Sequence, residues 1–366
     1  MNEPDLDDPT SYQALDTGGM LDFAVRFPAQ VQRAAEIGQE FARSVRLPRP
    51  RQVVLAGMGG SGVVGDCLAR LCEHRASVPL LVCRNYEIPA FVGTDTLFIA
   101  CSHSGDTEET LAAAREARRR RASMVCITTG GALRRFAKRC AKTGVRLLEI
   151  PQTTPPMPPR AALGYLLVPA VSVLQAAGLY PHARREIAEA VPLLERLRDR
   201  VGPKVPTARN QAKQLAKHLF GKMPWVQGTV GLMSAAAYRW RCQFNENSKV
   251  LACSSEYPEL NHNEVVGWEL ATRPDLAIEV VVLCRPGDDR RNQARVRITR
   301  RLLKSKARVH LVEAQGRLPL AQLLWAVYLG DFTSLYLGLL NGVNPASTEA
   351  IAVLKKELAR SRRLSS

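Results

Sequence analysis

The sequence predicts an α/β protein with two similar domains, each a doubly wound, mainly parallel sheet flanked by helices. Short apolar runs alternate with amphipathic helical segments along most of the chain, and the runs are apolar throughout. Strands buried on both faces have this composition, and intervening helices make neighbouring strands parallel. A Pro-rich passage at residues 151–160 divides the pattern into two series, and 366 residues suffice for two domains.

The first series lies before the Pro-rich passage. Apolar runs predict strands at residues 52–56, 79–83, 96–101, 124–128 and 145–150. Amphipathic spacing predicts helices at residues 61–73, 107–120 and 132–142. The Pro-rich passage itself can hold neither a helix nor a central strand, and a long helical region is expected after it, over residues 161–200.

The second series repeats this alternation with a different sequence. Strands are predicted at residues 224–230, 277–283 and 308–313, and helices at residues 208–220, 232–246, 289–304 and 319–340. We therefore predict a helical N-terminal extension at residues 1–40, a first domain at 41–185 and a second at 186–366. Ligands in such folds bind outside the carboxyl ends of the strands.

The chain is strongly basic, with a formal net charge of +17. The basic residues fall mostly on helix faces, aromatic residues are only 6%, and no nucleic-acid-binding module is recognisable. We expect no nucleic-acid partner, although the charge would attract an anionic substrate. No uncharged apolar run approaches 18 residues and the N-terminus is acidic, so neither a membrane span nor a signal peptide is expected.

The cysteines and histidines indicate no metal site. Nine cysteines form no C-x-x-C pair and lie in apolar runs, which predicts reduced core thiols and a cytoplasmic protein. The six histidines are far apart in sequence, so no metal is expected.

Two strand-end turns could together bind a phosphate. GMGGSG at residues 57–62 follows the first strand, and CSHSGDTEET at residues 101–110 contains the third strand's end. Glycine allows close approach, hydroxyls donate hydrogen bonds, and a helix N-terminus favours an anion. Three alternatives remain open: glycines kept for packing, a capping box of Asp106 and Glu109, and a dinucleotide site. Against the last, Arg84 and Asn85 stand where an acid would end the second strand.

The second half contains a carboxylate and a histidine, Glu246 and His262, within FNENSKVLACSSEYPELNHNEVVGW at residues 244–268. By themselves these residue types are common on helix ends and loops. The motifs around them favour a functional role for both residues.

These motifs resemble a known family. S-x-S-G-x-T at a strand-to-helix turn, with GMGGSG upstream, resembles the sugar isomerase (SIS) domain, which binds phosphosugars. NENSK followed by NHNE is similar to the bifunctional phosphoglucose/phosphomannose isomerases, which have two SIS domains. The similarity covers nearly the whole chain and includes LDDP, PPRAALGY at residues 158–165 and the C-terminal GVNPASTEAIAVLKKEL.

The resemblance implies roles for individual residues. Gly60, Ser61, Ser102, Ser104 and Thr107 would bind the substrate phosphate. Arg160 would lie beside the reacting carbons, Glu246 would transfer the proton, His262 would help to open the sugar ring, and Lys355 would lie near the ring oxygen. His262 is expected from the partner subunit, so the active site would require a homodimer. Thr348 would help to admit both C2 epimers, although Ala346-Ser347-Thr348-Glu349 departs from the family's P-T-P-like string.

The resemblance also implies an activity. It indicates an aldose–ketose isomerase that interconverts glucose 6-phosphate and mannose 6-phosphate with fructose 6-phosphate, without a cofactor. One carboxylate can move a proton between C1 and C2 through an enediol, and a nearby cation can stabilise the enediolate. A non-catalytic phosphosugar-binding regulator is the alternative, since a sensor needs the phosphate site but no base. An isomerase of another phosphosugar also stays open.

Overall fold

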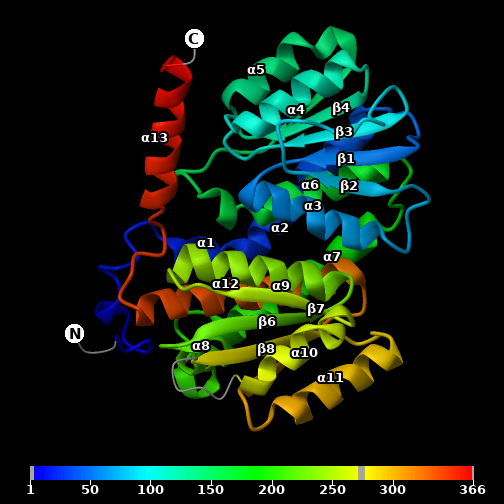
Figure 1. Ribbon diagram of the computed structural model, residues 1–366. Coiled ribbons are helices and arrows are strands. Elements are labelled where there is room, and N and C mark those ends of the chain that lie inside the picture. Colours follow the sequence, from blue (N-terminus) through cyan, green and yellow to red (C-terminus); the bar gives the residue numbers. More distant parts are fainter. Residues whose placement is uncertain (1–3, 271–276, 365–366) are drawn as a thin grey trace.

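The structure, a computed structural model, describes residues 4–270 and 277–364. Two parallel sheets are stacked with helices between them and on their outer faces (Figure 1). The first sheet has the strand order β2-β1-β3-β4-β5 and the second has the order β7-β6-β8-β9. The predicted fold class is confirmed.

The first sheet consists of β1 (Gln52–Ala56), β2 (Leu80–Cys83), β3 (Thr96–Cys101), β4 (Ser123–Thr128) and β5 (Val145–Glu149). Alternate side chains of β1, β3 and β4 point into two separate apolar clusters, so both faces of the sheet are buried. One cluster includes α3 (Gly59–Cys72) and α6 (Leu163–Ala176), and the other includes α4 (Glu108–Arg119) and α5 (Gly131–Arg139). This is a doubly wound, three-layered arrangement.

The second sheet consists of β6 (Met223–Thr229), β7 (Cys253–Tyr257), β8 (Ile278–Cys284) and β9 (Arg308–Glu313). On one face it packs against α9 (Leu232–Gln243) and α12 (Pro319–Leu340), with α8 (Gln211–Leu219) in the same cluster. The other face is covered by α11 (Arg290–Leu303) and by Trp268, which follows the short α10 (Glu264–Gly267).

One apolar core joins the two domains. Residues of α1 (Met20–Val25), α2 (Phe27–Ser44), α3, α6, α7 (Ala183–Val201), α9 and α12 belong to a single cluster that also receives side chains from both sheets. Helices α3 and α9 touch across the middle of the molecule. The relative position of the two sheets is therefore set by packed helices, as Figure 1 shows.

Helix α12 is the centre of this core. Among the described residues it is the one helix long and apolar enough to cross a membrane, and 94% of its most apolar window is buried inside the protein. It also contains Asp331 and Ser334, whose side chains are hydrogen-bonded to neighbouring elements. We therefore interpret α12 as the core helix of the second domain.

The structure differs from the sequence predictions at four places. Strand β7 was not predicted, because it is an edge strand whose polar sequence, CSSEY, is mostly half-buried. The helical region at 161–200 is two helices, since α6 ends at Ala176 and α7 begins at Ala183. The helix predicted at 232–246 ends at Gln243 and continues as a π-helical turn, Phe244–Ser248. Asp106 does not cap α4; its carboxylate accepts a hydrogen bond from the Ala132 N–H at the start of α5.

The C-terminal helix α13 (Glu349–Leu364) stands apart from the body of the molecule (Figure 1). It exposes large apolar side chains, with Val353 60% exposed and Leu354 59% exposed. Its apolar surface is thus not covered by the helices of its own chain.

Candidate active site

The two strand-end turns meet at the carboxyl edge of the first sheet, because β1 and β3 are adjacent. The Ser102 and Thr107 hydroxyls are 2.9 Å apart, and the Gly105 N–H donates to Ser102 Oγ over 3.1 Å. Ser61 Oγ accepts from the His103 N–H over 3.3 Å, which links the two turns. Ser61 and Ser102 are buried, while Ser104 is exposed at the rim. The structure thus brings together the predicted phosphate ligands of both turns.

Two helix N-termini add positive potential at this place. Helix α3 begins at Gly59 and α4 begins at Glu108, and neither has a side chain capping its first N–H groups. Free N–H groups and the helix dipole favour an anion at such a position. The hydroxyl cradle, defined as Ser61, Ser102, Ser104 and Thr107, therefore suits a phosphate although it contains no lysine or arginine.

Gly60 connects the cradle to Arg160. A Cβ atom on Gly60 would lie 3.1 Å from the Pro159 carbonyl oxygen and 3.4 Å from the Arg160 Cα. Such contacts are tight, so a side chain here would push the Pro-rich segment away from the start of α3. The absence of a side chain at Gly60 keeps Arg160 next to the cradle.

Arg160 is buried and held from several sides, with its side chain 4% exposed. Its Nε donates to Asn247 Oδ1 over 2.8 Å, and Nη2 donates to the carbonyl oxygens of Pro345 and Ala346. Nη1 lies 3.6 Å from Glu246 Oε2. Burial lowers the pKa of Arg160, and the Glu246 carboxylate opposes that shift. A fixed guanidinium of this kind can stabilise negative charge that develops beside it.

Glu246 is presented by the π-helical turn at residues 244–248, and its side chain is 28% exposed. The flanking residues fix the turn to α12: Asn247 Nδ2 donates to Ser334 Oγ over 3.0 Å, and Ser248 Oγ donates to the Ser334 carbonyl. Lys249 ends the turn in a left-handed conformation, with φ of 55°. The base candidate is therefore partly accessible while its backbone is locked.

A buried ion pair between Arg239 and Asp331, which was not predicted, contacts the backbone of Arg160. Arg239 Nη2 lies 2.9 and 3.0 Å from the two Asp331 oxygens and also donates to the Arg160 carbonyl over 2.9 Å. Gln243 Nε2 donates to Asp331 over 2.8 Å. Burial raises the pKa of Asp331, and Arg239 opposes the shift. These residues position the site. The sequence signal that could have revealed them is Asp331, a single charged residue within the apolar helix α12.

His103 is a further residue that the sequence reasoning missed. It lies within the cradle between Ser102 and Ser104, and burial lowers its pKa from 6.5 to about 4. Its backbone carbonyl accepts from the Thr129 hydroxyl over 2.8 Å. The imidazole is thus neutral near pH 7, beside the predicted phosphate position.

Two predicted residues, His262 and Lys355, are not gathered with this group in one chain, whereas Thr348 follows two residues after Ala346, whose carbonyl accepts a hydrogen bond from Arg160. His262 is exposed in a 3₁₀ turn after β7, whereas Glu246 precedes β7. With a rise of about 3.3 Å per residue, a strand of this length separates its two ends by roughly 16 Å. Lys355 is exposed on α13, and Thr348 is half-buried just before that helix.

The described residues contain no cluster of three His, Cys, Asp or Glu side chains that could hold a metal. All nine cysteines are free thiols, and six of them are buried. Arg84, at the end of β2, donates to the Gly62 carbonyl over 3.0 Å and pairs with Asp66. That arginine therefore occupies the place where a dinucleotide site would need an acidic residue.

Comparison with known proteins identifies relatives over most of the chain. The family described as "SIS domain" matches residues 47–145, and "Bacterial phospho-glucose isomerase C-terminal SIS domain" matches residues 208–358. A bifunctional phosphoglucose/phosphomannose isomerase of Caldicellulosiruptor bescii is 38% identical over 93% of this chain and 99% of its own length. That of Thermoplasma volcanium is 33% identical over 87% and 95%. Among solved structures, a glucose-6-phosphate isomerase like protein from Thermus thermophilus has a TM-score of 0.63 at 22% identity, covering 95% and 99%.

Proposed function

Since the chain belongs to the bifunctional phosphoglucose/phosphomannose isomerase family, we propose that it interconverts fructose 6-phosphate with glucose 6-phosphate and with mannose 6-phosphate. The observation that carries the proposal is the Glu246 carboxylate, 3.6 Å from the buried Arg160 guanidinium, which Gly60 keeps next to the hydroxyl cradle. A regulator that only senses a phosphosugar needs the cradle but has no use for this pair. The family and the pair together favour the enzyme.

The cradle binds the phosphate in this proposal. Ser61, Ser102, Ser104 and Thr107 donate hydroxyl hydrogen bonds, and the first N–H groups of α3 and α4, including that of Gly60, face the same anion. The anchored substrate then extends toward Arg160 and Glu246. Binding energy from the phosphate thereby orients C1 and C2 for the reaction.

Glu246 moves the proton. From glucose or mannose 6-phosphate in the open-chain form, the carboxylate removes the C2 proton, and an enediolate forms whose negative charge Arg160 stabilises. Return of the proton to C1, with a proton exchanged between O2 and O1, gives fructose 6-phosphate. No electrons leave the substrate, so the protein's own residues suffice. Both epimers give the same enediol, and we propose that Thr348 admits both.

The complete site requires a homodimer in this proposal, and His262 of the partner subunit opens the sugar ring. The support is the position of Glu246 before β7 and of His262 after it, so that one chain does not bring them together. The apolar side chains of Ile351, Val353 and Leu354, 43%, 60% and 59% exposed on α13, fit a surface covered in the dimer. Once α13 is packed there, Lys355 reaches the ring oxygen and hydroxyls.

Subunit complementation tests the shared site. Glu246→Gln and His262→Ala proteins, each inactive alone, are mixed under conditions of proven subunit exchange. Because one site of each hybrid dimer carries neither substitution, the mixture is expected to regain activity. A mixture that stays inactive would assign both residues to one chain.

We propose that the enzyme serves glycolysis and gluconeogenesis through glucose 6-phosphate and fructose 6-phosphate, and that it is cytoplasmic with reduced thiols, in keeping with its nine free cysteines. The proposed domain limits remain 1–40, 41–185 and 186–366. The test of the activity is an assay started with fructose 6-phosphate that measures glucose 6-phosphate and mannose 6-phosphate separately. Both products are expected. Binding of fructose 6-phosphate without either product would establish the regulator instead.

A further inference from the structure

A strained lysine ends the turn that carries the proposed base. Among the described residues, only Arg121 and Lys249 have a positive φ without being glycine, at 62° and 55°. Glycine or asparagine usually fills such a position at the end of a helix, because a Cβ atom is unfavourable there. Strain of this kind persists where the surrounding structure enforces it, and it is common at functional sites. Lys249 follows Glu246 by 3 residues, so its strain lies next to the base.

The Lys249 side chain folds back onto the turn. Its Nζ donates a hydrogen bond to the backbone carbonyl of Glu246. In a continuing helix this carbonyl would accept from a backbone N–H one turn later. Here the N–H groups of Lys249 and Val250 both donate to the Phe244 carbonyl instead. The ammonium therefore replaces the missing backbone donor and fixes the peptide unit of the base.

The same ammonium lies within electrostatic range of the reacting groups. Partial burial lowers the pKa of Lys249, and the positive charge of Arg160 lowers it further. The carboxylates of Glu246 and of Glu349, the first residue of α13, oppose that shift. Three segments that are distant in sequence thus face this one ammonium: the 3₁₀ turn of Arg160, the π-helical turn and the start of α13.

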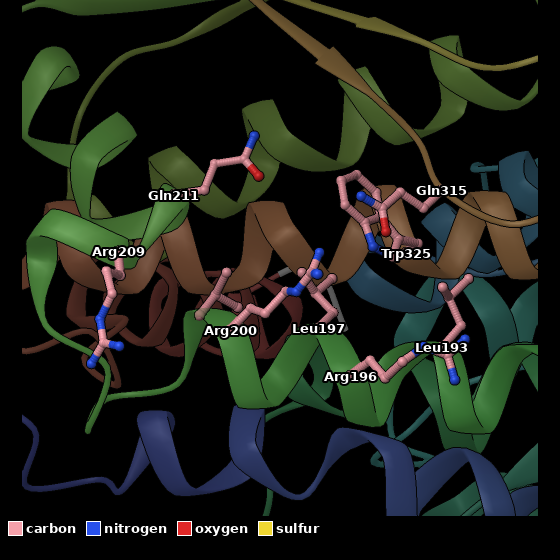
Figure 2. A pocket seen from close by; sticks show the side chains of 9 residues that line it. Leu193, Arg196, Leu197, Arg200, Arg209, Gln211, Gln315 and Trp325 are labelled. Carbon is pink, nitrogen blue, oxygen red and sulfur yellow. The ribbon is translucent and has the colours of Figure 1, made fainter.

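A contrast with arginines elsewhere on the protein supports a specific role. Arg196, Arg200 and Arg209 line the cavity in Figure 2; all three are exposed, and their side chains make no hydrogen bond or ion pair within the part of the chain that the structure describes. Such side chains contribute only to the general positive charge. The ammonium of Lys249, by contrast, is bonded to the backbone of the base itself.

We propose that Lys249 is a positioning residue for Glu246. Its hydrogen bond holds the peptide unit of the base, and its positive charge adds to that of Arg160 where the enediolate forms. Glycine would close the turn with less strain but could supply neither effect. The inference rests on the proposed isomerase function, and it gives a role to a second residue of the NENSK motif.

Steady-state assays of three variants test the role of the ammonium. Lys249→Asn suits the left-handed backbone but lacks the charge, and Lys249→Met keeps much of the length of the side chain. For both variants, kcat for glucose 6-phosphate is expected to fall about tenfold or more while KM stays within about twofold, because the phosphate still anchors the substrate. Lys249→Arg keeps the charge and a donor, so its kcat is expected to stay within about threefold of the wild type.

A purely structural role predicts a different result for Lys249→Asn. Asparagine is well suited to the left-handed position at a helix end, so the melting temperature and kcat would both be kept. Normal kcat in Lys249→Asn, or equal losses of kcat in Lys249→Arg and Lys249→Met, would overturn the proposal. Circular dichroism gives the folded fraction by which each kcat is corrected, and Lys249→Asn decides the question if Lys249→Met fails to fold.

The matched control is Arg121→Met, which removes a positive charge from the other strained position. Arg121 lies just before β4, at the amino edge of the first sheet and away from the cradle, so kcat and KM are expected to stay unchanged. The wild type and Glu246→Gln separate the two proposals. A wild type that forms no product would overturn both, whereas an active wild type, an inactive Glu246→Gln and a fully active Lys249→Asn would overturn only the role of Lys249.

Discussion

The carboxyl edges of the two sheets have the same construction but opposite chemistry. In the first domain, the turns after β1 and β3 leave hydroxyls and helix N-termini open to an anion. In the second, Thr229 at the end of β6 donates to Asp288 Oδ2 over 2.7 Å, and the Arg285 N–H donates to the same oxygen over 2.9 Å. A carboxylate of the protein itself thus occupies the second edge, and the fold alone does not create a phosphate site.

The second domain contributes Glu246 from the amino edge of its sheet, opposite to the carboxyl edge. Strands β6 and β7 are parallel neighbours, so α9 between them must return the chain to the amino edge of the sheet. Glu246 follows α9 and lies at this edge, facing Arg160 of the first domain. One domain therefore binds the phosphate with its strand-end turns, and the other presents its base from the opposite end of its strands.

The largest effect is expected when the base is removed. Glu246→Gln keeps the shape of the side chain but cannot accept a proton, so kcat should fall about 10²–10⁴-fold for both epimers, while KM changes little. Steady-state assays with glucose 6-phosphate and mannose 6-phosphate measure this. If mannose 6-phosphate turnover survived while glucose 6-phosphate turnover vanished, a second base would have to exist.

Disruption of the cradle should act on KM rather than kcat. Ser102→Ala with Thr107→Val removes two hydroxyl donors from a dianion, each worth about 1.5–3 kcal/mol, so KM is expected to rise by about 10² or more. The control is Thr229→Val, which removes a buried hydroxyl from the carboxyl edge of the second sheet, away from the cradle, and should leave KM unchanged. An unaltered KM in the first-domain variant would place the phosphate elsewhere.

The sequence predicted the parts of the protein that local pattern controls. The strands of the first sheet and helix α12 were predicted correctly, because burial determines the secondary structure of apolar runs of this length. Edge strand β7 and the π-helical turn at 244–248 were missed because their conformation depends on tertiary partners, such as the Asn247 bond to Ser334. Likewise, the meeting of Glu246 with Arg160 follows from packing between distant parts of the chain and could only be expected from the family resemblance.

The third prediction concerns the closed edge of the second sheet. Asp288→Ala removes the acceptor of Thr229 and Arg285, whose Nε lies 3.2 Å from Asp288 Oδ1. We expect a loss of about 3 kcal/mol in the free energy of unfolding, because charged hydrogen bonds are lost and buried donors stay unpaired. Urea denaturation measures the loss, and KM for fructose 6-phosphate should be unchanged. A raised KM with normal stability would mean that this edge also binds substrate.

The last prediction concerns His103, which has no counterpart at the edge of the second sheet among residues 228–231 and 284–288. Burial lowers its pKa from 6.5 to about 4 in the folded protein. Between these two pH values the unfolded chain binds a proton that the folded chain does not, so folding stability falls as the pH falls through this window. Above pH 6.5 the histidine contributes no pH dependence, and below pH 4 its contribution is constant.

Relative to His103→Gln, the wild type should lose about 2 kcal/mol of unfolding free energy between pH 7 and pH 4, an estimate that allows for partial solvation. Urea denaturation of both proteins across this range gives the difference directly, and other titrating groups cancel in it. Parallel curves for the two proteins would show that the His103 ring is solvated, and the cradle would then be wetter than its buried serines indicate.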